Sequence, residues 1–144
     1  MIKIICVGKL KENYLKEGIN DYLKRINKYH KIEIIELPDS NIENEEKEII
    51  KHINEKDFLV AMCIEGEMLS SLELSSKIEK IFITNSCITF IIGGSDGISN
   101  KIKEKCQYKL SFSKLTYPHG LFRLILLEQI YRSFKIINNE SYHK

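Results

Sequence analysis

The residues with the clearest chemical potential follow an apolar run, Thr89 to Ile92. The chain passes there directly into Gly93-Gly94-Ser95-Asp96-Gly97. A buried strand that feeds a glycine-rich turn is where an α/β protein brings its backbone close to a small ligand. The spacing matches neither the dinucleotide fingerprint nor a Walker lysine motif, and most turns of this kind only reverse the chain. The turn therefore indicates a candidate ligand site that needs support from other residues.

Further side chains capable of chemistry lie between Pro118 and the last residue. His119 follows Pro118, where a histidine usually acts as a cap or local hydrogen-bonding residue and less often as a catalyst. Arg132 lies four residues after Glu128, the spacing of an ion pair within one helix, although its planar guanidinium also suits phosphate binding. The run Tyr142-His143-Lys144 puts titratable donors at the end of the chain, where residues are disordered by default.

Length and cysteine usage set the frame for these candidates. The 144 residues fit a single domain, 1–144, that is large enough to bury a substantial core. The four cysteines form no Cys-x-x-Cys pair, which favours reduced thiols, a cytoplasmic protein and no metal site. We also expect no signal peptide and no membrane partner, since no apolar run approaches the ~18 residues of a membrane span.

The net charge of +2 conceals a segregation along the chain. Residues 1–31 carry +5 and residues 98–144 carry +6, whereas residues 32–57 carry −6 and residues 58–97 carry −3. If the two basic ends meet in space, they form a cationic face suited to a polyanion such as RNA. The alternative is that exposed lysines serve only solubility.

Apolar periodicity predicts strands that alternate with helices. The strands are expected at Ile2–Val7, Ile32–Leu37, Phe58–Ile64, Ile88–Ile92 and Tyr108–Phe112. Between and after them the pattern predicts helices over 11–29, from a Ser40-x-x-Glu43 capping box to about Asn54, from a Ser70-x-x-Glu73 box through Ile81, from Ser99 to Cys106, and over 119–135. This order predicts an α/β fold with a mostly parallel sheet and helices on both faces.

The final predicted helix is apolar in nearly every direction. Only Glu128, Arg132 and Lys135, beside Gln129 and Ser133, form a polar stripe. A helix of this kind is buried on more than one side, and in so small a protein we expect one side to face a partner subunit. Twofold pairs are the commonest oligomers, so the prediction is a homodimer.

In this order the motifs resemble one family, the ribosomal RNA large subunit methyltransferase H family of the SPOUT methyltransferases. The resemblance covers nearly the whole chain and is densest from Phe90 onward. It is carried by Phe90-Ile91-Ile92-Gly93-Gly94-Ser95-Asp96-Gly97, by Leu110 to His119, by Leu127-Glu128-Gln129-Ile130-Tyr131-Arg132 and by the terminal Tyr142-His143-Lys144.

The resemblance implies a C-terminal trefoil knot, a homodimer and transfer of a methyl group from S-adenosylmethionine. The substrate it implies is N3 of a pseudouridine in 23S ribosomal RNA, in the helix 69 region of the assembled 70S ribosome. The positions that match the family's cofactor-binding residues are Met62, Gly93, Phe112, Ser113, Lys114, Leu115, Thr116 and Tyr117.

Three further residues are candidates for the catalytic step that the resemblance implies. His143, or water held by the tail, can accept the N3 proton; Tyr142 can stack on or hydrogen-bond the target base; and Arg132 can hold a phosphate. The chain departs from the family in a region about a dozen residues shorter after Asp39, in Ser141 where proline is usual, and in Gly120 where glutamine is usual.

Three alternatives remain open at the level of sequence. One is a related knotted methyltransferase that acts on transfer RNA or on another ribosomal base. The second is a non-catalytic RNA-binding factor in ribosome assembly, which would bind RNA without cofactor. The third is a small dimeric α/β metabolic enzyme that uses the glycine turn for a nucleotide.

Overall fold

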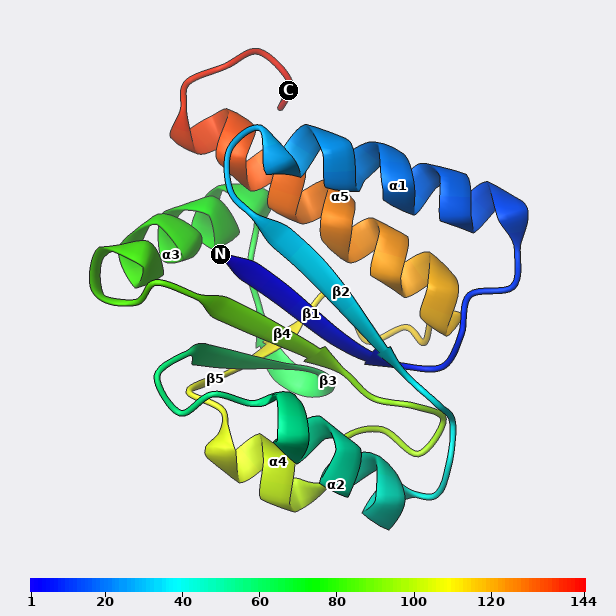
Figure 1. Cartoon of the computed structure of the whole chain (residues 1–144). Coiled ribbons are helices and arrows are strands. Elements are labelled where there is room, and N and C mark those ends of the chain that lie inside the picture. The colour runs from blue at the N-terminus through cyan, green and yellow to red at the C-terminus, as the bar shows by residue number, and fades with distance from the viewer.

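The computed structural model describes residues 1–144 and has five strands that form one parallel sheet (Figure 1). The strands are β1 (Ile2–Val7), β2 (Ile32–Leu37), β3 (Phe58–Met68), β4 (Ile88–Ile92) and β5 (Tyr108–Ser111), and their order across the sheet is β2-β1-β4-β3-β5. Every neighbouring pair is parallel. The predicted α/β class with a parallel sheet is therefore confirmed, whereas the trefoil knot stays a prediction.

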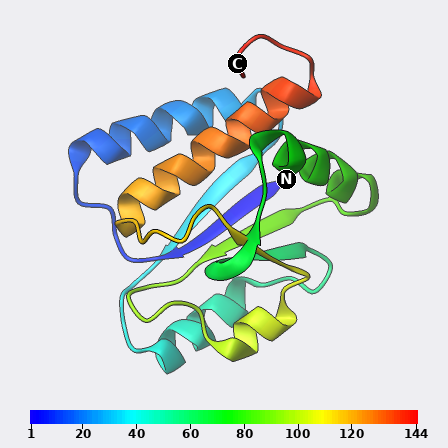
Figure 2. The same cartoon turned by 180° about the vertical axis from the view of Figure 1, so that it is seen from behind.

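The helices cover both faces of the sheet. The five helices are α1 (Asn13–Asn27), α2 (Ile42–His52), α3 (Ser71–Thr84), α4 (Asn100–Lys105) and α5 (His119–Ile137). Figures 1 and 2 show α1, α3 and α5 on one face and α2 and α4 on the other. Side chains alternate between the two faces of each strand. On β1, for example, Ile4 joins the larger core under α1, α3 and α5, whereas Ile5 joins the smaller core under α2 and α4.

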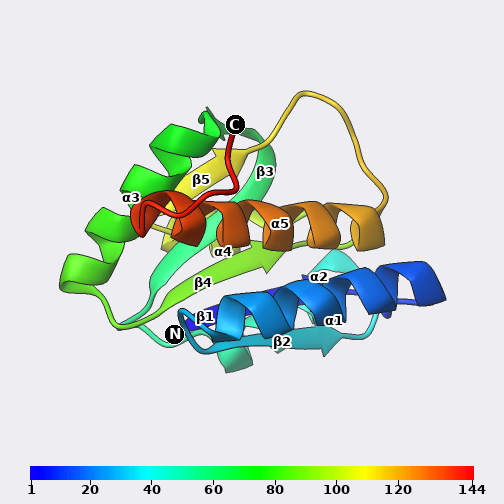
Figure 3. The same ribbon diagram turned by 90° about the horizontal axis from the view of Figure 1, so that it is seen from above.

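Helix α5 is apolar on nearly all sides because it is surrounded by other elements of the same chain. Seen from above, α5 lies between α1 and α3 and over the sheet (Figure 3). Its Leu126, Leu127 and Ile130 are fully buried in the core that these elements share. Only Leu121, near its start, is an exposed large apolar residue of this helix. The pattern of α5 therefore does not by itself require a partner subunit.

Several element ends shift by one to a few residues, and two differences from the sequence-based expectation have a clear structural cause. The predicted capping box at Ser40 is wrong, because Asn41 caps α2 by accepting a hydrogen bond from the Asn44 amide at 2.8 Å. The Ser40 amide donates instead to the Glu45 carboxylate at 2.8 Å. By contrast, the Ser70 box of α3 and the Ser99 cap of α4 are confirmed.

The other difference is the length of β3, which continues past the predicted end at Ile64 to Met68. Its pairing with β5 shifts between Met62 and Glu67, so that both residues are opposite Leu110. Gly66 lies inside this shift, and a Cβ there would come within 2.6 Å of the Leu110 backbone. The bend thus depends on glycine, and it carries residues 63–66 around the edge of the site described next.

No helix of the chain is long and apolar enough to cross a membrane.

Candidate functional site

A cavity of about 320 Å³ opens where β3, β4 and β5 end. Its walls come from the bend of β3, the turn after β4, the segment that follows β5 and the first turn of α5. Ten of its 20 lining residues are hydrophobic, so a largely apolar ligand with a few polar groups would suit it. Ligands of parallel α/β sheets bind at this carboxyl edge.

The structure brings seven of the eight predicted cofactor residues to this one cavity. They come from three separate stretches of the chain and are Met62, Gly93, Phe112, Ser113, Leu115, Thr116 and Tyr117. Lys114 is the exception, because it is exposed and does not line the cavity. Met62 is buried and presents its thioether to the cavity, whereas Leu115 is 69% exposed at its mouth.

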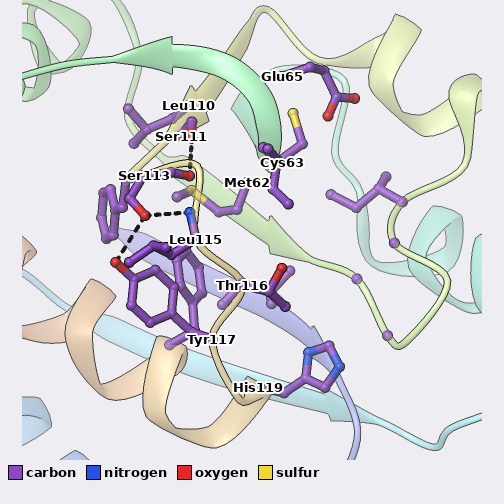
Figure 4. Close-up of a pocket in the computed structure, with 18 of the residues that line it drawn as sticks. Met62, Cys63, Glu65, Leu110, Ser111, Ser113, Leu115, Thr116, Tyr117 and His119 are labelled. Carbon is purple, nitrogen blue, oxygen red and sulfur yellow. Dashed lines mark hydrogen bonds between the residues drawn. The ribbon is translucent and has the colours of Figure 1, made fainter.

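Ser113 organises the segment between β5 and α5. Its Oγ accepts hydrogen bonds from the Leu115 amide at 2.8 Å and from the Tyr117 hydroxyl at 3.1 Å, and its carbonyl accepts one from the Ser111 hydroxyl at 3.0 Å. Figure 4 shows these bonds as the dashed lines around Ser113. The side chain of Ser113 therefore shapes one wall of the cavity.

The glycines of the turn after β4 are required by close contacts with neighbouring protein atoms. A Cβ on Gly93 would lie 2.5 Å from the carbonyl carbon of Gly97, and one on Gly94 would lie 2.9 Å from the Glu45 carboxylate. Gly97 has a φ of 76°, in the left-handed region that glycine adopts most easily. The turn thus folds tightly on itself and leaves the space beside it open.

Four charged or titratable side chains at the cavity are Cys63, Glu65, Lys103 and His119. Lys103 of α4 donates a hydrogen bond to the carboxylate of Glu65 in the β3 bend, and this contact lowers the pKa of Glu65. Burial, followed by the charge of Glu65, raises the pKa of the Cys63 thiol. His119 lies across the cavity from Glu65, beside Thr116 (Figure 4).

The predicted catalytic residues form a second cluster around the end of α5. The Tyr142 hydroxyl donates to Glu128 at 3.2 Å and lies 3.4 Å from the Tyr22 hydroxyl. The Arg132 guanidinium lies 4.8 Å from the centre of the Tyr142 ring and also donates to Glu128. Burial, followed by the hydrogen bond with Tyr22 and the charge of Glu128, raises the pKa of Tyr142. The terminal residues are thus docked on α1 and α5.

His143 is engaged by Arg132 in this arrangement. The Arg132 Nη1 lies 3.1 Å from His143 Nδ1. Arginine can only donate, so Nδ1 is the acceptor in this contact. His143 can therefore take up a proton at Nδ1 only after this contact opens.

The two clusters lie at opposite ends of α5. His119 and Phe122 line the cavity, whereas none of Arg132, Tyr142 and His143 does. A rise of 1.5 Å per residue puts Arg132 about 20 Å along the helix from His119. Within one chain, the structure does not bring the predicted catalytic residues to the predicted cofactor residues.

Sequence reasoning missed the two charged residues of the cavity rim. Glu65 and Lys103 were not among the predicted site residues, and His119 was noted only as a possible catalyst. A signal existed for Glu65, since it follows an apolar strand at the edge where parallel sheets bind ligands. No signal existed for its pairing with Lys103, because the two residues are 38 positions apart.

Fold and cavity together define an α/β protein with a small-ligand site at the carboxyl edge of its sheet. Residues 1–143 match a family model described as a predicted SPOUT methyltransferase. The chain is also 46% identical to the ribosomal RNA large subunit methyltransferase H of Enterococcus faecalis and 47% identical to that of Clostridium botulinum, with 99% of each chain covered. A putative ribosomal RNA large subunit methyltransferase H of Methanococcus maripaludis is 48% identical with the same coverage.

Among solved structures, the fold is similar to that of a tRNA (m1G37) methyltransferase from Aquifex aeolicus. The TM-score is 0.55 at 14% identity, and the match covers 91% of this chain and 69% of that one. The chain belongs to the SPOUT methyltransferases and, within them, to the ribosomal RNA large subunit methyltransferase H family. The alignments to these relatives extend over 157 positions, so the relatives hold residues that this shorter chain lacks.

Proposed function

We propose that this protein transfers a methyl group from S-adenosylmethionine to N3 of a pseudouridine in 23S ribosomal RNA, in the helix 69 region of the assembled 70S ribosome. One observation carries the proposal: seven residues expected to hold the cofactor line a single cavity. The chain that holds them is 46–48% identical to proteins named ribosomal RNA large subunit methyltransferase H or its putative form. The assembled ribosome also implies a cytoplasmic location.

The cavity suits the adenosyl part of the cofactor. Its volume is about 320 Å³ and its walls include Met62, Phe112 and Leu115, which offer apolar contact to a flat base. When bound, S-adenosylmethionine supplies an electrophilic methyl group on a sulfonium.

The chain's own contribution to the reaction is alignment and removal of one proton. Methyl transfer is an in-line displacement, so most of the reduction in the activation barrier comes from holding the two reactants in line. The N3 proton of the target base passes to His143 once Arg132 releases Nδ1, or to a water molecule held by the tail. Arg132 is then free to hold a phosphate of the RNA.

The separation of the two clusters favours a homodimer in which one protomer's tail serves the other's cavity. The exposed side chains of Tyr14 and Leu121, at the start of α1 and α5, are apolar and support a contact between subunits on this part of the surface. Those two helix ends are adjacent, because a Cβ on Gly120 would meet Leu15 at 2.8 Å. A pair formed there would have its contact next to each cavity.

The packing of α1 against α5 supports an RNA partner. The charge pattern predicts a cationic face if the two basic segments, 1–31 and 98–144, meet in space. Helix α1 belongs to the first segment and α5 to the second, and the two helices lie side by side (Figure 3). The exposed lysines of α1 are Lys16 and Lys24, and the exposed Lys28 follows the end of the helix. Cations that neutralise phosphates provide most of the affinity for RNA independent of its sequence.

Calorimetric titration with S-adenosylhomocysteine tests the cofactor assignment. We expect binding by the unaltered protein and at least about tenfold weaker binding by Leu115→Asp, because the new carboxylate would be desolvated against the base. Ile83→Ser, on the exposed side of α3 and outside the cavity, is the matched control and should bind as the parent does. Absence of binding to the parent, or equal binding by Leu115→Asp, contradicts the assignment.

A further inference from the structure

The cavity rim holds one anion and one ammonium, and they are paired with each other. Among the 20 lining residues, Glu65 has the only carboxylate and Lys103 the only amine. Their side chains come from different elements, since Glu65 lies in the bend of β3 and Lys103 on α4. Lys103 is 19% exposed and Glu65 is 54% exposed, so the carboxylate is the part that reaches solvent and ligand.

The pair leaves acceptor capacity on Glu65. Lys103 donates to Oε1, and no other side chain hydrogen-bonds this carboxylate. An ionised carboxylate accepts through both oxygens and donates through neither, so beyond Lys103 and its own backbone amide Glu65 keeps lone pairs that can accept from a ligand. The contact with Lys103 also keeps Glu65 ionised, because it lowers the pKa of that carboxyl group.

The ribose of an adenosyl ligand is well suited to such an acceptor. The ribose has two adjacent hydroxyl donors, whereas the base can be held by apolar contacts and backbone groups. The other polar side chains of the cavity are hydroxyls, a thiol, an imidazole and the Lys103 amine, and Ser113 already accepts two bonds within its own segment. Hydrogen bonds to an ionised acceptor are about twice as strong as those between neutral groups.

We propose that Glu65 binds the ribose hydroxyls of the cofactor and that Lys103 is the positioning residue that holds its carboxylate at the cavity rim. This inference rests on the proposed function, since it takes the ligand to be an adenosyl compound. On this proposal the bend of β3 has a role in ligand binding in addition to its pairing with β5. The register shift that Gly66 permits places Glu65 beside the cavity.

The test compares ribose with deoxyribose in matched variants. S-adenosylhomocysteine, adenosine, 2′-deoxyadenosine and 3′-deoxyadenosine are titrated into the parent, Glu65→Ala and Glu104→Ala. Glu104 is the neighbour of Lys103 on α4, is exposed and lies outside the cavity, so its variant is the control. We expect the parent and the control to prefer adenosine over each deoxynucleoside by about tenfold or more, as hydrogen bonds to a charged acceptor predict. In Glu65→Ala the preference should fall to roughly threefold or less, because adenosine loses two hydrogen bonds to the carboxylate whereas each deoxynucleoside loses only one.

Each other result has a defined meaning. A preference that survives in Glu65→Ala, or is absent from the parent, overturns the ribose assignment while cofactor binding stands. Weaker binding of S-adenosylhomocysteine by Glu65→Ala with unchanged binding of adenosine also overturns it, because Glu65 would then hold the amino group of the amino-acid part. If the parent binds none of the four ligands, the cofactor assignment fails together with the inference.

The positioning role of Lys103 is tested by the pH dependence of ribose preference, which a purely structural role of Lys103 would not change. The groups that face Glu65 are Lys103 on α4, Lys109 on β5 and Cys63 on its own strand. Without Lys103 the pKa of Glu65 returns toward its usual range, so Lys103→Met should lose ribose preference at a higher pH than the parent as the solution is acidified. Lys103→Arg should restore the parent profile. Identical profiles for parent and Lys103→Met would remove Lys103 from the proposal.

Discussion

The guanidinium of Arg123 donates a hydrogen bond to the carboxylate of Glu36 at 2.6 Å and joins the first turns of α5 to the end of β2. A second nitrogen of Arg123 donates to the Gly8 carbonyl at 3.1 Å, just after β1. The Leu10 amide donates to the same carboxylate at 3.2 Å. Arg123 is only 2% exposed, and its contacts fix the helix start that carries His119 and Phe122 to the cavity.

Arg123→Met should therefore lower the free energy of unfolding by about 2 kcal/mol, since it removes charge-assisted hydrogen bonds while nearly conserving volume. The loss is limited because Glu36 is partly exposed and because the buried Arg123 Nε has no partner to lose. Urea denaturation of Arg123→Met, Glu36→Gln and the double variant measures it. The double variant should be less destabilised than the two single changes added together; strict additivity would mean that the pair is not coupled.

The capping box of α3 gives a prediction of stability that is independent of the site. Ser70 Oγ accepts from the Glu73 amide at 3.1 Å, and the Glu73 carboxylate accepts from the Ser70 amide at 2.9 Å. Ser70→Ala should cost about 1 kcal/mol by thermal or urea denaturation. Ser70→Asp should recover most of that loss, because aspartate is also a good N-cap residue. An unchanged midpoint in Ser70→Ala would show that α3 does not depend on its cap.

Cys63 offers a direct probe of the occupied cavity, because its side chain lines the wall (Figure 4). With S-adenosylhomocysteine at ten times its dissociation constant, alkylation of Cys63 should slow by roughly tenfold, in proportion to the remaining free protein. Mass spectrometry of the alkylated peptides measures the rate. Cys106 is the internal control, since it lies outside the cavity and burial raises its pKa to about 11. Unchanged labelling of Cys63 would place the ligand elsewhere.

The docked tail predicts a loss of stability at alkaline pH. The pKa of Tyr142 in the folded protein lies above the usual value of about 10, so the folded state holds this proton more tightly than the unfolded state. The resulting stabilisation is complete below pH 10 and is lost as the pH rises above that value. Melting temperatures between pH 8 and 11 should therefore fall less steeply in Tyr142→Phe than in the parent. Tyr14→Phe, at an exposed tyrosine, should leave the parent slope unchanged; equal slopes in all three proteins would show that the tail is not docked.

The sequence was sufficient for the parts of the fold that depend on short-range patterns. The bounds of β1, β2 and β4 were predicted to the residue, because each is a short apolar run with a clear stop such as Gly8, Pro38 or Gly93. The Ser70 cap was found for the same reason. The start of α2 was not, since both Ser40 and Asn41 are good caps and the choice depends on Glu45 taking the Ser40 amide.

Long-range relationships were beyond the sequence. Alternation ends at Glu65-Gly66, so nothing local indicates that β3 bends and pairs a second time with Leu110. The cofactor positions were found through the family resemblance, which supplies residues that physical periodicity alone would not single out. The position of Tyr142 beside Tyr22 and Glu128 depends on contacts across the fold, so the distance between the tail and the cavity could not be predicted.

Methyl transfer itself is the most direct test of the central claim. The purified protein is incubated with methyl-labelled S-adenosylmethionine and with 70S ribosomes that lack the modification, and the nucleosides of the 23S RNA are then separated by mass spectrometry. The account predicts label in N3-methylpseudouridine from the helix 69 region and none after replacement of both Tyr142 and His143 by alanine, with cofactor binding retained. Cofactor binding without any labelled ribosomal RNA, or label at another nucleoside, would contradict it.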